Sequence, residues 1–191
     1  LLDKGARCDA TCEYDKNTPL HSATMQGYGN IVQLLIDHHA DVNARNEYQY
    51  TPLTHAITNN RIDLVEMLLK ADAKCNIQDY SGNLPLQKAV EKGNTALVKM
   101  LLDYDPTIIN EKQGYTEKTA LHIAVQRDRI QMIQTLLDYH ADVNAVDNQG
   151  ATPLFSLFPK NYYTAVYPDI LKRLIASGAD VNIQQNNGDT P

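Results

Sequence analysis

A four-residue block returns along this chain at nearly constant spacing. The first copy is Thr18-Pro19-Leu20-His21, and later copies begin at Thr51, Leu84, Thr119, Thr152 and Thr190, at intervals of 33, 33, 35, 33 and 38 residues. A period near 33 residues predicts a stack of small units, in which each unit contacts only its neighbours. Such an array offers a long side surface and no deep pocket, so the repeat favours binding over catalysis.

Each block carries the signals of a helix start. Thr18 can cap a helix through its hydroxyl, and Pro19 suits the first turn, where its missing N–H would have no partner in any case. An alanine follows five residues after four of the anchors, where a small side chain lets neighbouring helices approach closely: Ala23, Ala56, Ala89 and Ala124. After a break at Gly27, a second segment places apolar residues at helical spacing, as in Ile31, Val32, Leu34 and Leu35. We therefore expect a pair of helices in each unit.

Two further elements recur in step with the anchor. The block Ala40-Asp41-Val42-Asn43-Ala44 returns as Ala141-Asp142-Val143-Asn144-Ala145 and, in part, as Ala179-Asp180-Val181-Asn182. Together with Thr-Pro-Leu-His-x-Ala, this pattern resembles the ankyrin repeat over nearly the whole chain. The resemblance implies an all-α solenoid of stacked helix-turn-helix units with β-hairpin-like fingers.

We interpret residues 1–191 as a single ankyrin-repeat array. Full repeats are expected at 13–45, 46–78, 79–113, 114–146 and 147–184, with the end of one repeat at 1–12 and the start of another at 185–191. The sequence starts inside the end of a second helix and stops as a new repeat begins, so we expect flanking repeats in the same full-length chain.

Residues other than glycine occupy most of the helix ends and finger tips at which a left-handed conformation is expected. A second helix usually ends in a residue of left-handed conformation, and this chain keeps glycine there only at Gly5 and Gly178. We expect His39, Asp72, Asp105 and His140 to take that conformation at the other four ends, at some cost relative to glycine. The finger tips have glycine at Gly82 and Gly150, whereas Lys16, Gln49 and Glu117 replace it. We expect those three tips to be distorted.

The composition limits which classes of partner and which cellular compartments are compatible with this chain. The net charge of −6 and the pI near 5.4 disfavour binding to a nucleic-acid backbone. The sequence holds no apolar run of about 18 residues, so we expect no direct membrane insertion. Three cysteines without a framework fit a reducing compartment, and we expect the cytoplasm or the nucleus.

The cysteines and histidines, which could bind a metal or take part in catalysis, do not form a recognisable catalytic or metal site in the sequence. Cys8-x-x-x-Cys12 is at most half of a metal site, because a closed zinc site needs four ligands. His21 and His122 occupy the anchor histidine without a partnered nucleophile, and each is expected to hydrogen-bond backbone atoms within its own turn. No phosphate loop, nucleophile-base-acid order or nucleotide fingerprint appears. We expect no enzyme activity within these residues, no cofactor and no metal.

Candidate binding residues follow from the resemblance, which places partners on the finger tips and the concave face of the first helices. Tyrosine recurs on four successive fingers, at Tyr14, Tyr48 with Tyr50, Tyr80 and Tyr115. Tyrosine combines a large contact area with a polar tip and is enriched at interfaces, although each ring could instead fold back on its own finger. The inner ends of the first helices supply Met25, Gln26, Asn59, Lys92 and Arg127. Together with their neighbours Thr58, Glu91 and Gln126, these positions are mostly polar and mixed in sign, and so suit a polypeptide better than a polyanion.

Two further features are the irregular last full repeat and the asparagines that recur after the second helices. In the last full repeat Leu157 replaces the small alanine, and about five extra residues fall within Pro159 to Pro168, as either a binding loop or a self-packed lid. The resemblance also makes Asn43, Asn144 and Asn182 candidates for β-hydroxylation, beside a structural role in bonding the finger backbone.

The sequence favours a scaffold that binds a partner protein or peptide along its finger tips and concave groove. Two alternatives stay open. The array could be a structural segment of a larger channel, toxin or cytoskeletal adaptor that packs intramolecularly. It could also be the targeting module of a ubiquitin ligase or another enzyme whose catalytic part lies outside this chain.

Overall fold

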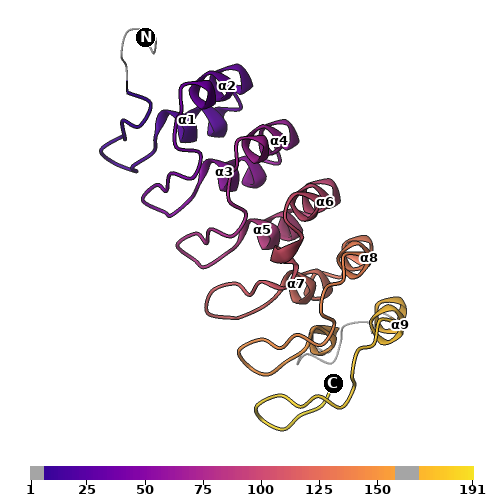
Figure 1. Ribbon diagram of the computed structural model, residues 1–191. Helices are drawn as coiled ribbons and strands as arrows, with labels where there is room; N and C mark the ends of the chain where they lie inside the picture. Colours follow the sequence, from indigo (N-terminus) through magenta and orange to yellow (C-terminus); the bar gives the residue numbers. More distant parts are fainter. Residues whose placement is uncertain (1–6, 158–167) are drawn as a thin grey trace. The chain divides into compact units, whose positions relative to one another are not determined.

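The computed structural model describes residues 7–157 and 168–191, and it divides into two compact units, residues 1–92 and 93–191. Every element in the described ranges is a helix, which confirms the all-α prediction. Within each unit, the first helices of successive repeats lie in one row and the second helices in another, and the fingers project beyond the first helices (Figure 1).

From residue 7 onward, unit 1 is built from paired helices. They are α1 (Pro19–Gln26), α2 (Gly29–Asp37), α3 (Pro52–Thr58), α4 (Ile62–Lys70) and α5 (Pro85–Lys92). Helices α1, α3 and α5 are the first helices of their repeats, and α3 packs against both α1 and α5. Helix α2 packs against α1 and α4, so the stack is held along both rows.

Unit 2 begins with a second helix. Its elements are α6 (Thr95–Tyr104), the 3₁₀ helix η2 (Pro106–Asn110), α7 (Ala120–Gln126), α8 (Ile130–Asp138), the 3₁₀ helix η3 (Pro153–Leu157) and α9 (Pro168–Ala176). Helix α8 packs against α6, α7 and α9, while η3 takes the place of a first helix beside α7. Leu157 is buried at the alanine position, and the first element of this repeat is the tighter and shorter 3₁₀ form. The expected binding loop or lid falls at residues 158–167, outside the described residues.

Threonine caps the first helices as predicted. Thr18 Oγ1 accepts a hydrogen bond from the backbone N–H of His21, and the imidazole of His21 accepts one from the backbone N–H of Thr18. The same reciprocal capping box joins Thr119 and His122, and Thr51 caps α3. Each box satisfies backbone donors that would otherwise lack a partner at the helix start.

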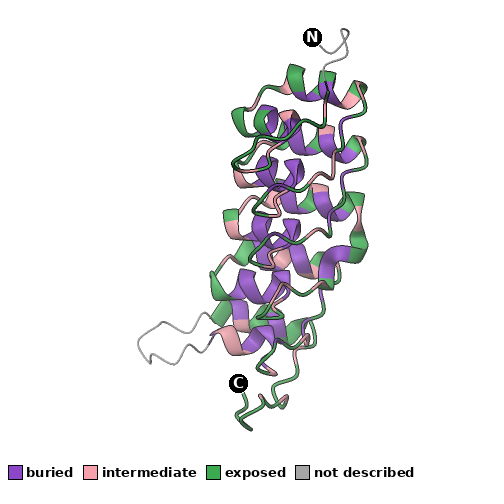
Figure 2. Ribbon diagram, turned by 90° about the vertical axis from the view of Figure 1, so that its left-hand side faces the viewer, coloured by how far each residue is buried: buried purple, intermediate pink, exposed green. Residues whose placement is uncertain are grey.

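The alanines and the apolar faces form the core of each unit. The four alanines are buried, and so are Val32 and Leu35 of α2 and their counterparts in the later second helices. Figure 2 shows the buried residues gathered on the helix faces that turn toward other helices. Ile31 and Leu34 are instead exposed, although Leu64, which corresponds to Ile31 one repeat later, is completely buried.

Two turn predictions are wrong, one at a helix end and one at the finger tips. His39, Asp72 and His140 adopt positive φ as predicted, but Asp105 has φ −140° because its carboxylate caps η2 through the backbone N–H of Thr107. At the finger tips, Lys16, Gln49 and Glu117 take φ values of 58°, 60° and 52°, which are the left-handed values that glycine supplies elsewhere. These tips therefore keep the turn instead of distorting it, and the three side chains bear the steric cost.

Candidate functional site

The fingers, numbered here in chain order within the described residues, project from both units. Unit 1 carries finger 1 (residues 12–17), finger 2 (46–50) and finger 3 (79–83), and unit 2 carries finger 4 (113–118), finger 5 (147–151) and finger 6 (185–189). Two backbone hydrogen bonds close each finger, as in finger 2, where Asn46 N–H donates to Tyr50 O and Gln49 N–H donates to Asn46 O. The fingers are tight turns, and the described residues contain an isolated bridge between Gln113 and Lys118 but no strand.

Backbone hydrogen bonds also join neighbouring fingers within a unit. In unit 1, Glu47 N–H donates to Asp15 O at 2.9 Å, and Tyr80 N–H donates to Tyr48 O at 3.0 Å. In unit 2, Asn148 N–H donates to Thr116 O, and Asn186 N–H donates to Gln149 O. We call the three joined fingers of unit 1 the finger row. These backbone bonds help to set the spacing of the finger tips within each unit.

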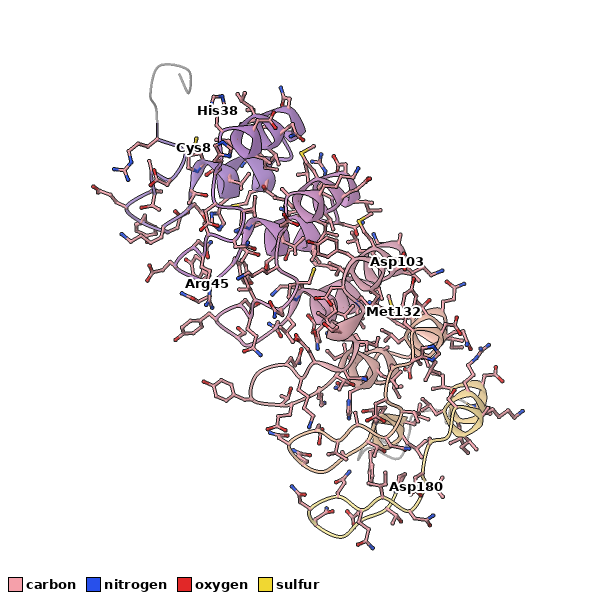
Figure 3. All side chains as sticks on the ribbon, in the orientation of Figure 1. Cys8, His38, Arg45, Asp103, Met132 and Asp180 are labelled. Carbon is pink, nitrogen blue, oxygen red and sulfur yellow. The ribbon has the colours of Figure 1, made fainter. Side chains whose placement is uncertain are left out.

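The finger row presents three tyrosine rings to solvent. Tyr14, Tyr48 and Tyr80 are 91%, 57% and 80% exposed, and Tyr115 on finger 4 of unit 2 is 90% exposed. Tyr14, Tyr80 and Tyr115 bury little surface on their own fingers, whereas the Tyr48 ring lies beside that of Tyr50, with the ring centres 6.5 Å apart. In Figure 3, phenol rings extend from the fingers away from the helices.

Tyr50 lies differently from the other finger tyrosines. Its half-buried ring packs edge-on against the imidazole of His55, with the ring centres 5.3 Å apart, and Lys88 Nζ lies 4.7 Å from the ring centre. Tyr50 thus follows the alternative prediction, in which a tyrosine ring folds back and packs locally and is not presented to a partner. Tyr50 therefore belongs to the base of finger 2 more than to its tip.

A carbonyl or carboxylate oxygen at the base of a finger holds the turn. In finger 2, Asn46 Oδ1 accepts from the backbone N–H groups of Tyr48 and Tyr50, at 3.0 and 2.9 Å. Asp79 of finger 3 accepts from Ser81 and Asn83, and Asp147 of finger 5 accepts from Gln149 and Ala151, in the same pattern. All three acceptors are buried.

The residue nine positions after the acceptor lies on the first helix and contacts it. Lys88 Nζ donates to Asp79 in a buried ion pair, and His55 Nε2 lies 3.4 Å from Asn46 Nδ2. Burial alone would raise the pKa of Asp79, but hydrogen bonds from Lys88 and Asn83 outweigh it and hold that pKa below its usual value. Sequence reasoning missed both pairs, although the +4 position after each anchor, which holds Ser22, His55, Lys88, Ile123 and Ser156, would have flagged the two cationic residue types.

The anchor histidines are neutral and fully bonded. His21 Nε2 donates to Tyr50 O at 2.9 Å, while its Nδ1 faces Thr18; His122 makes the same bonds to Ala151 O and Thr119. Burial lowers the pKa of both imidazoles. A ring that uses both nitrogens in this way has no free atom for proton transfer. Through the bond to Tyr50 O or Ala151 O, each of these histidines holds the finger of the next repeat.

The residues expected on the inner ends of the first helices lie at the surface. Met25, Gln26, Asn59 and Lys92 are exposed in unit 1, as is Arg127 in unit 2. Asn59 Nδ2 lies within hydrogen-bonding distance of Met25 O, at 3.5 Å, so the first two repeats are linked there. In unit 1 these side chains place one apolar group, two amides and one cation beside the finger row.

Two of the three asparagines considered for hydroxylation link successive repeats. Asn43 Oδ1 accepts from Lys74 N–H at 2.8 Å and its Nδ2 donates to Asp72 O, while Asn144 bonds Asp180 N–H and Gly178 O in the same way. The side chain of Asn182 instead donates to the carboxylate of Asp180, two residues away. Asn43 and Asn144 thus have the structural role that was expected beside modification.

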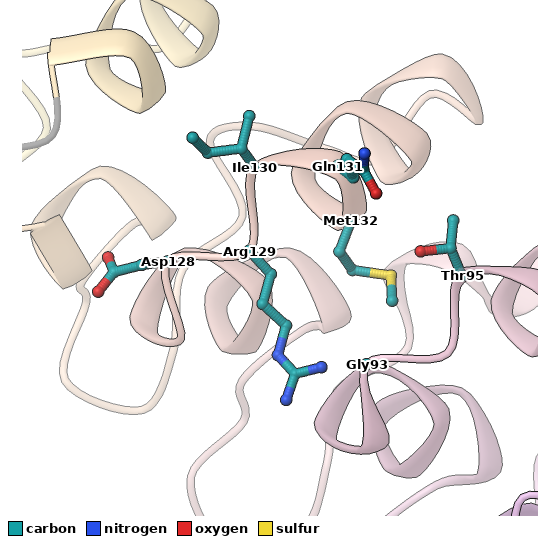
Figure 4. Close-up of a pocket in the computed structure, with 7 residues that line it drawn as sticks. All are labelled: Gly93, Thr95, Asp128, Arg129, Ile130, Gln131 and Met132. Carbon is teal, nitrogen blue, oxygen red and sulfur yellow. The ribbon is translucent and has the colours of Figure 1, made fainter.

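An open pocket of about 360 Å³ lies between α6 and α8 of unit 2 (Figure 4). Its lining includes Gly93, Thr95, Arg129 and Met132, and the guanidinium of Arg129 extends toward Gly93. This lining lacks a nucleophile paired with a base. Across residues 7–157 and 168–191, no cluster of three His, Cys, Asp or Glu residues is arranged to hold a metal. In those same ranges, no helix is both long enough and apolar enough to cross a lipid bilayer.

Comparisons with known proteins give one consistent family. Two models described as ankyrin repeats match residues 1–79 and 109–154. The chain is 39% identical over 88 residues to the putative ankyrin repeat protein FPV031 of fowlpox virus, which covers 44% of this chain and 25% of that protein. It is 36% identical over 72 residues to human protein phosphatase 1 regulatory subunit 27, which covers 38% of this chain and 44% of that protein. The chain therefore spans less than half the length of these relatives.

A solved structure matches the fold over the whole chain. It is the crystal structure of the ankyrin repeat domain of Bcl-3, described as a unique member of the IkappaB protein family. The TM-score is 0.88 at 25% sequence identity, and the match covers 100% of this chain and 82% of that chain.

Proposed function

This chain belongs to the ankyrin-repeat family, and from that premise we propose that it is a scaffold that binds a partner protein or peptide along its finger tips and the inner ends of its first helices. Ankyrin repeats are in general protein–protein interaction modules. The observation that carries the proposal for this chain is the finger row, in which three exposed tyrosines stand on turns joined by backbone hydrogen bonds.

Tyrosine suits a binding role at these positions because of how it is held. A ring with two rotatable bonds on a rigid turn loses little conformational entropy when a partner covers it. Interfaces concentrate their binding energy in a few such residues, each of which costs about 2 kcal/mol or more when truncated. Tyr14, Tyr48 and Tyr80 are the hot-spot candidates on unit 1, with Tyr115 on unit 2.

The inner ends of the first helices supply the surrounding contacts. Met25, Gln26, Asn59 and Lys92 offer one apolar group, two amides and one cation beside the finger row. A polar rim around aromatic anchors is the usual anatomy of a protein interface, and a standard one buries roughly 1,600 Å² in total. The mixture of apolar, amide and cationic groups supports a polypeptide partner, and the net charge of −6 opposes a nucleic acid.

The proposal gives the chain no catalytic step of its own. The anchor imidazoles are occupied by backbone atoms. No disulfide joins Cys8, Cys12 and Cys75, which supports a reducing compartment such as the cytoplasm or the nucleus.

Site-specific photo-crosslinking tests the location of the surface. A photoreactive amino acid is placed at Tyr48 or Tyr80, and in a control variant at Tyr28, an exposed tyrosine that precedes the second helix α2. We expect one partner to be cross-linked from positions 48 and 80 and not from 28. Equal cross-linking from all three positions would contradict the proposed finger surface.

A further inference from the structure

Two neutral imidazoles lie together at the base of finger 2. The rings of His21 and His55 meet edge to face with their centres 5.7 Å apart, and both side chains are buried. His21 comes from α1 and bonds the carbonyl oxygen of Tyr50, while His55 comes from α3 and contacts Asn46 and the Tyr50 ring. Finger 2 is thus held from beneath by two imidazoles, which come from two successive first helices.

Each imidazole accepts a hydrogen bond on one ring nitrogen. The carbonyl of Tyr50 can only accept, so His21 carries its proton on Nε2 and accepts from Thr18 N–H on Nδ1. Asn46 directs its NH₂ group at His55 Nε2, so that nitrogen is the acceptor in the second ring. A protonated imidazole is a donor at both nitrogens. Protonation of His55 Nε2 therefore places two donors face to face, whereas the hydroxyl oxygen of Thr18, 2.9 Å from His21 Nδ1, can accept from a proton there.

The surrounding charges act in both directions: Lys88 disfavours an imidazolium at His55, whereas Asp15 favours one at both rings and Asp41 favours one at His21. Lys88 of α5 is a cation near His55, and its ion pair occupies the nearby buried carboxylate of Asp79. Asp15 of finger 1 faces both rings, but it accepts hydrogen bonds from Asn17. Asp41, which faces His21, accepts from Asn43 N–H. Burial, followed by the proximity of His21, lowers the pKa of His55 to about 4.

Asn46 connects the imidazoles to the shape of the finger. Its NH₂ group faces His55 and donates to Asn17 Oδ1 at 2.9 Å, while its oxygen holds the N–H groups of Tyr48 and Tyr50. Rotation of the amide by half a turn would present the oxygen to a protonated His55. The same rotation would remove the acceptor that both finger amides need.

We propose that His55 and Asn46 form an acid-sensitive latch, in which a proton on His55 Nε2 turns the Asn46 amide away from the turn and opens finger 2. The proton comes from solvent, and no covalent bond changes. Opening moves Tyr48 and breaks its link to Tyr80, so acid disorders the middle of the finger row while the helices stay folded. The latch is a property of the finger itself and does not depend on the proposed partner binding.

The chain contains its own comparisons. Finger 3 has an aspartate acceptor paired with Lys88, and Thr54 stands where His21 stands for finger 2 and His122 for finger 5. Gln87 takes the same position in the following repeat. Finger 5 has an aspartate acceptor and a single imidazole, His122, with Ser156 at the position of His55. Sensitivity to acid should therefore be greatest in finger 2, smaller in finger 5 and least in finger 3.

Amide hydrogen exchange measured by NMR on the wild-type chain tests this order. With an ordinary pKa of 6.5 in the open finger and about 4 in the closed one, linkage predicts that protection of the Tyr48 and Tyr50 amides falls about 30-fold from about pH 7.5 to about pH 5, after correction for intrinsic exchange. The Ser81 and Asn83 amides of finger 3 should keep their protection. Equal loss in fingers 2 and 3, or loss shared by the helix amides, would overturn the latch.

Two variants separate the latch from general destabilisation. Asn46→Asp installs the acceptor that fingers 3 and 5 already use, and its carboxylate can pair with a protonated His55; we expect the acid-induced loss in finger 2 to disappear. His55→Gln should also remove it, whereas His122→Gln, a substitution with a precedent at Gln87, should leave finger 2 as in the wild type. A full loss of about 30-fold that persists in a folded Asn46→Asp or His55→Gln chain would refute the proposal.

Discussion

The guanidinium group of Arg61 occupies the space that a side chain on Gly27 would fill. A Cβ built on Gly27 would lie 1.6 Å from Arg61 Nη1, and Arg61 Nη2 donates to Gly27 O at 3.1 Å. Arg61 is also paired with Asp63, which fixes the guanidinium. The same relationship recurs in unit 2, where a Cβ on Gly93 would lie 1.4 Å from Arg129 Nη1. Because glycine has no side chain, the arginine of the following repeat can pack against this turn.

This relationship predicts a destabilising effect for Gly27→Ala. The substitution strains a residue at φ +79° and moves the flexible end of Arg61 away from Gly27 O, so we expect the free energy of unfolding to fall by about 1–2 kcal/mol in urea titrations. Gly188→Ala is the control, because Gly188 has φ +88° but a Cβ placed on it would meet no atom within 4 Å. Equal losses in the two variants would show that backbone strain alone matters.

The asparagine links between repeats give a second prediction. Asn43→Ala leaves the backbone N–H of Lys74 without its acceptor, so we expect a loss of about 1–2 kcal/mol in the free energy of unfolding. Asn182→Ala, which removes only a local contact with Asp180, should change it by less than about 0.5 kcal/mol. Chemical denaturation of both variants measures the difference, and a loss at Asn182 as large as that at Asn43 would argue against the linking role.

The buried pair of Asp79 and Lys88 gives a third prediction. Lys88→Met leaves a buried carboxylate without its cation, so we expect a loss of about 3–5 kcal/mol. The double variant Asp79→Asn with Lys88→Met should recover much of that loss, because no uncompensated charge remains. Thermal unfolding of the single and double variants measures the coupling, and strictly additive losses would contradict it.

The same pair sets a direction for pH dependence. The pKa of Asp79 is lower in the folded chain than its usual value of 3.8. The unfolded chain therefore binds the proton first, and the stability that Asp79 contributes is present above about pH 4 and lost as the pH falls through its folded value. Acid titrations of the wild type and the double variant should diverge below about pH 4. Parallel curves in that range would mean that Asp79 carries no such linkage.

The sequence predicted the elements that depend on spacing. The threonine caps, the buried alanines and the second helices follow from local chemistry repeated every 33 residues, and the structure contains all of them. The left-handed conformation of His39 and Asp72 was predictable for the same reason. Asp105 was not, because the extra residues after α6 let it cap η2, a competing local structure that the repeat pattern does not contain.

The candidate site was less accessible to sequence reasoning. The exposed finger tyrosines followed from position, but the half-buried ring of Tyr50 depends on His55 and Lys88, which come from the same and the next repeat. Pairing between Asn46 and His55 is likewise set by how a finger folds onto its own first helix. The repeat period shows which residues occupy the same position in successive repeats. It does not show which of those residues make different contacts.

Binding measured beside stability tests the central claim most directly. The partner identified by cross-linking is titrated against the wild type, the Tyr14→Ala/Tyr48→Ala/Tyr80→Ala variant, and a Tyr28→Ala control. We predict that the triple variant melts within a few degrees of the wild type and binds at least about 30-fold more weakly, the cost of one hot spot of about 2 kcal/mol, while the control binds normally. Unchanged affinity in a folded triple variant would contradict the claim that the finger row is the binding surface.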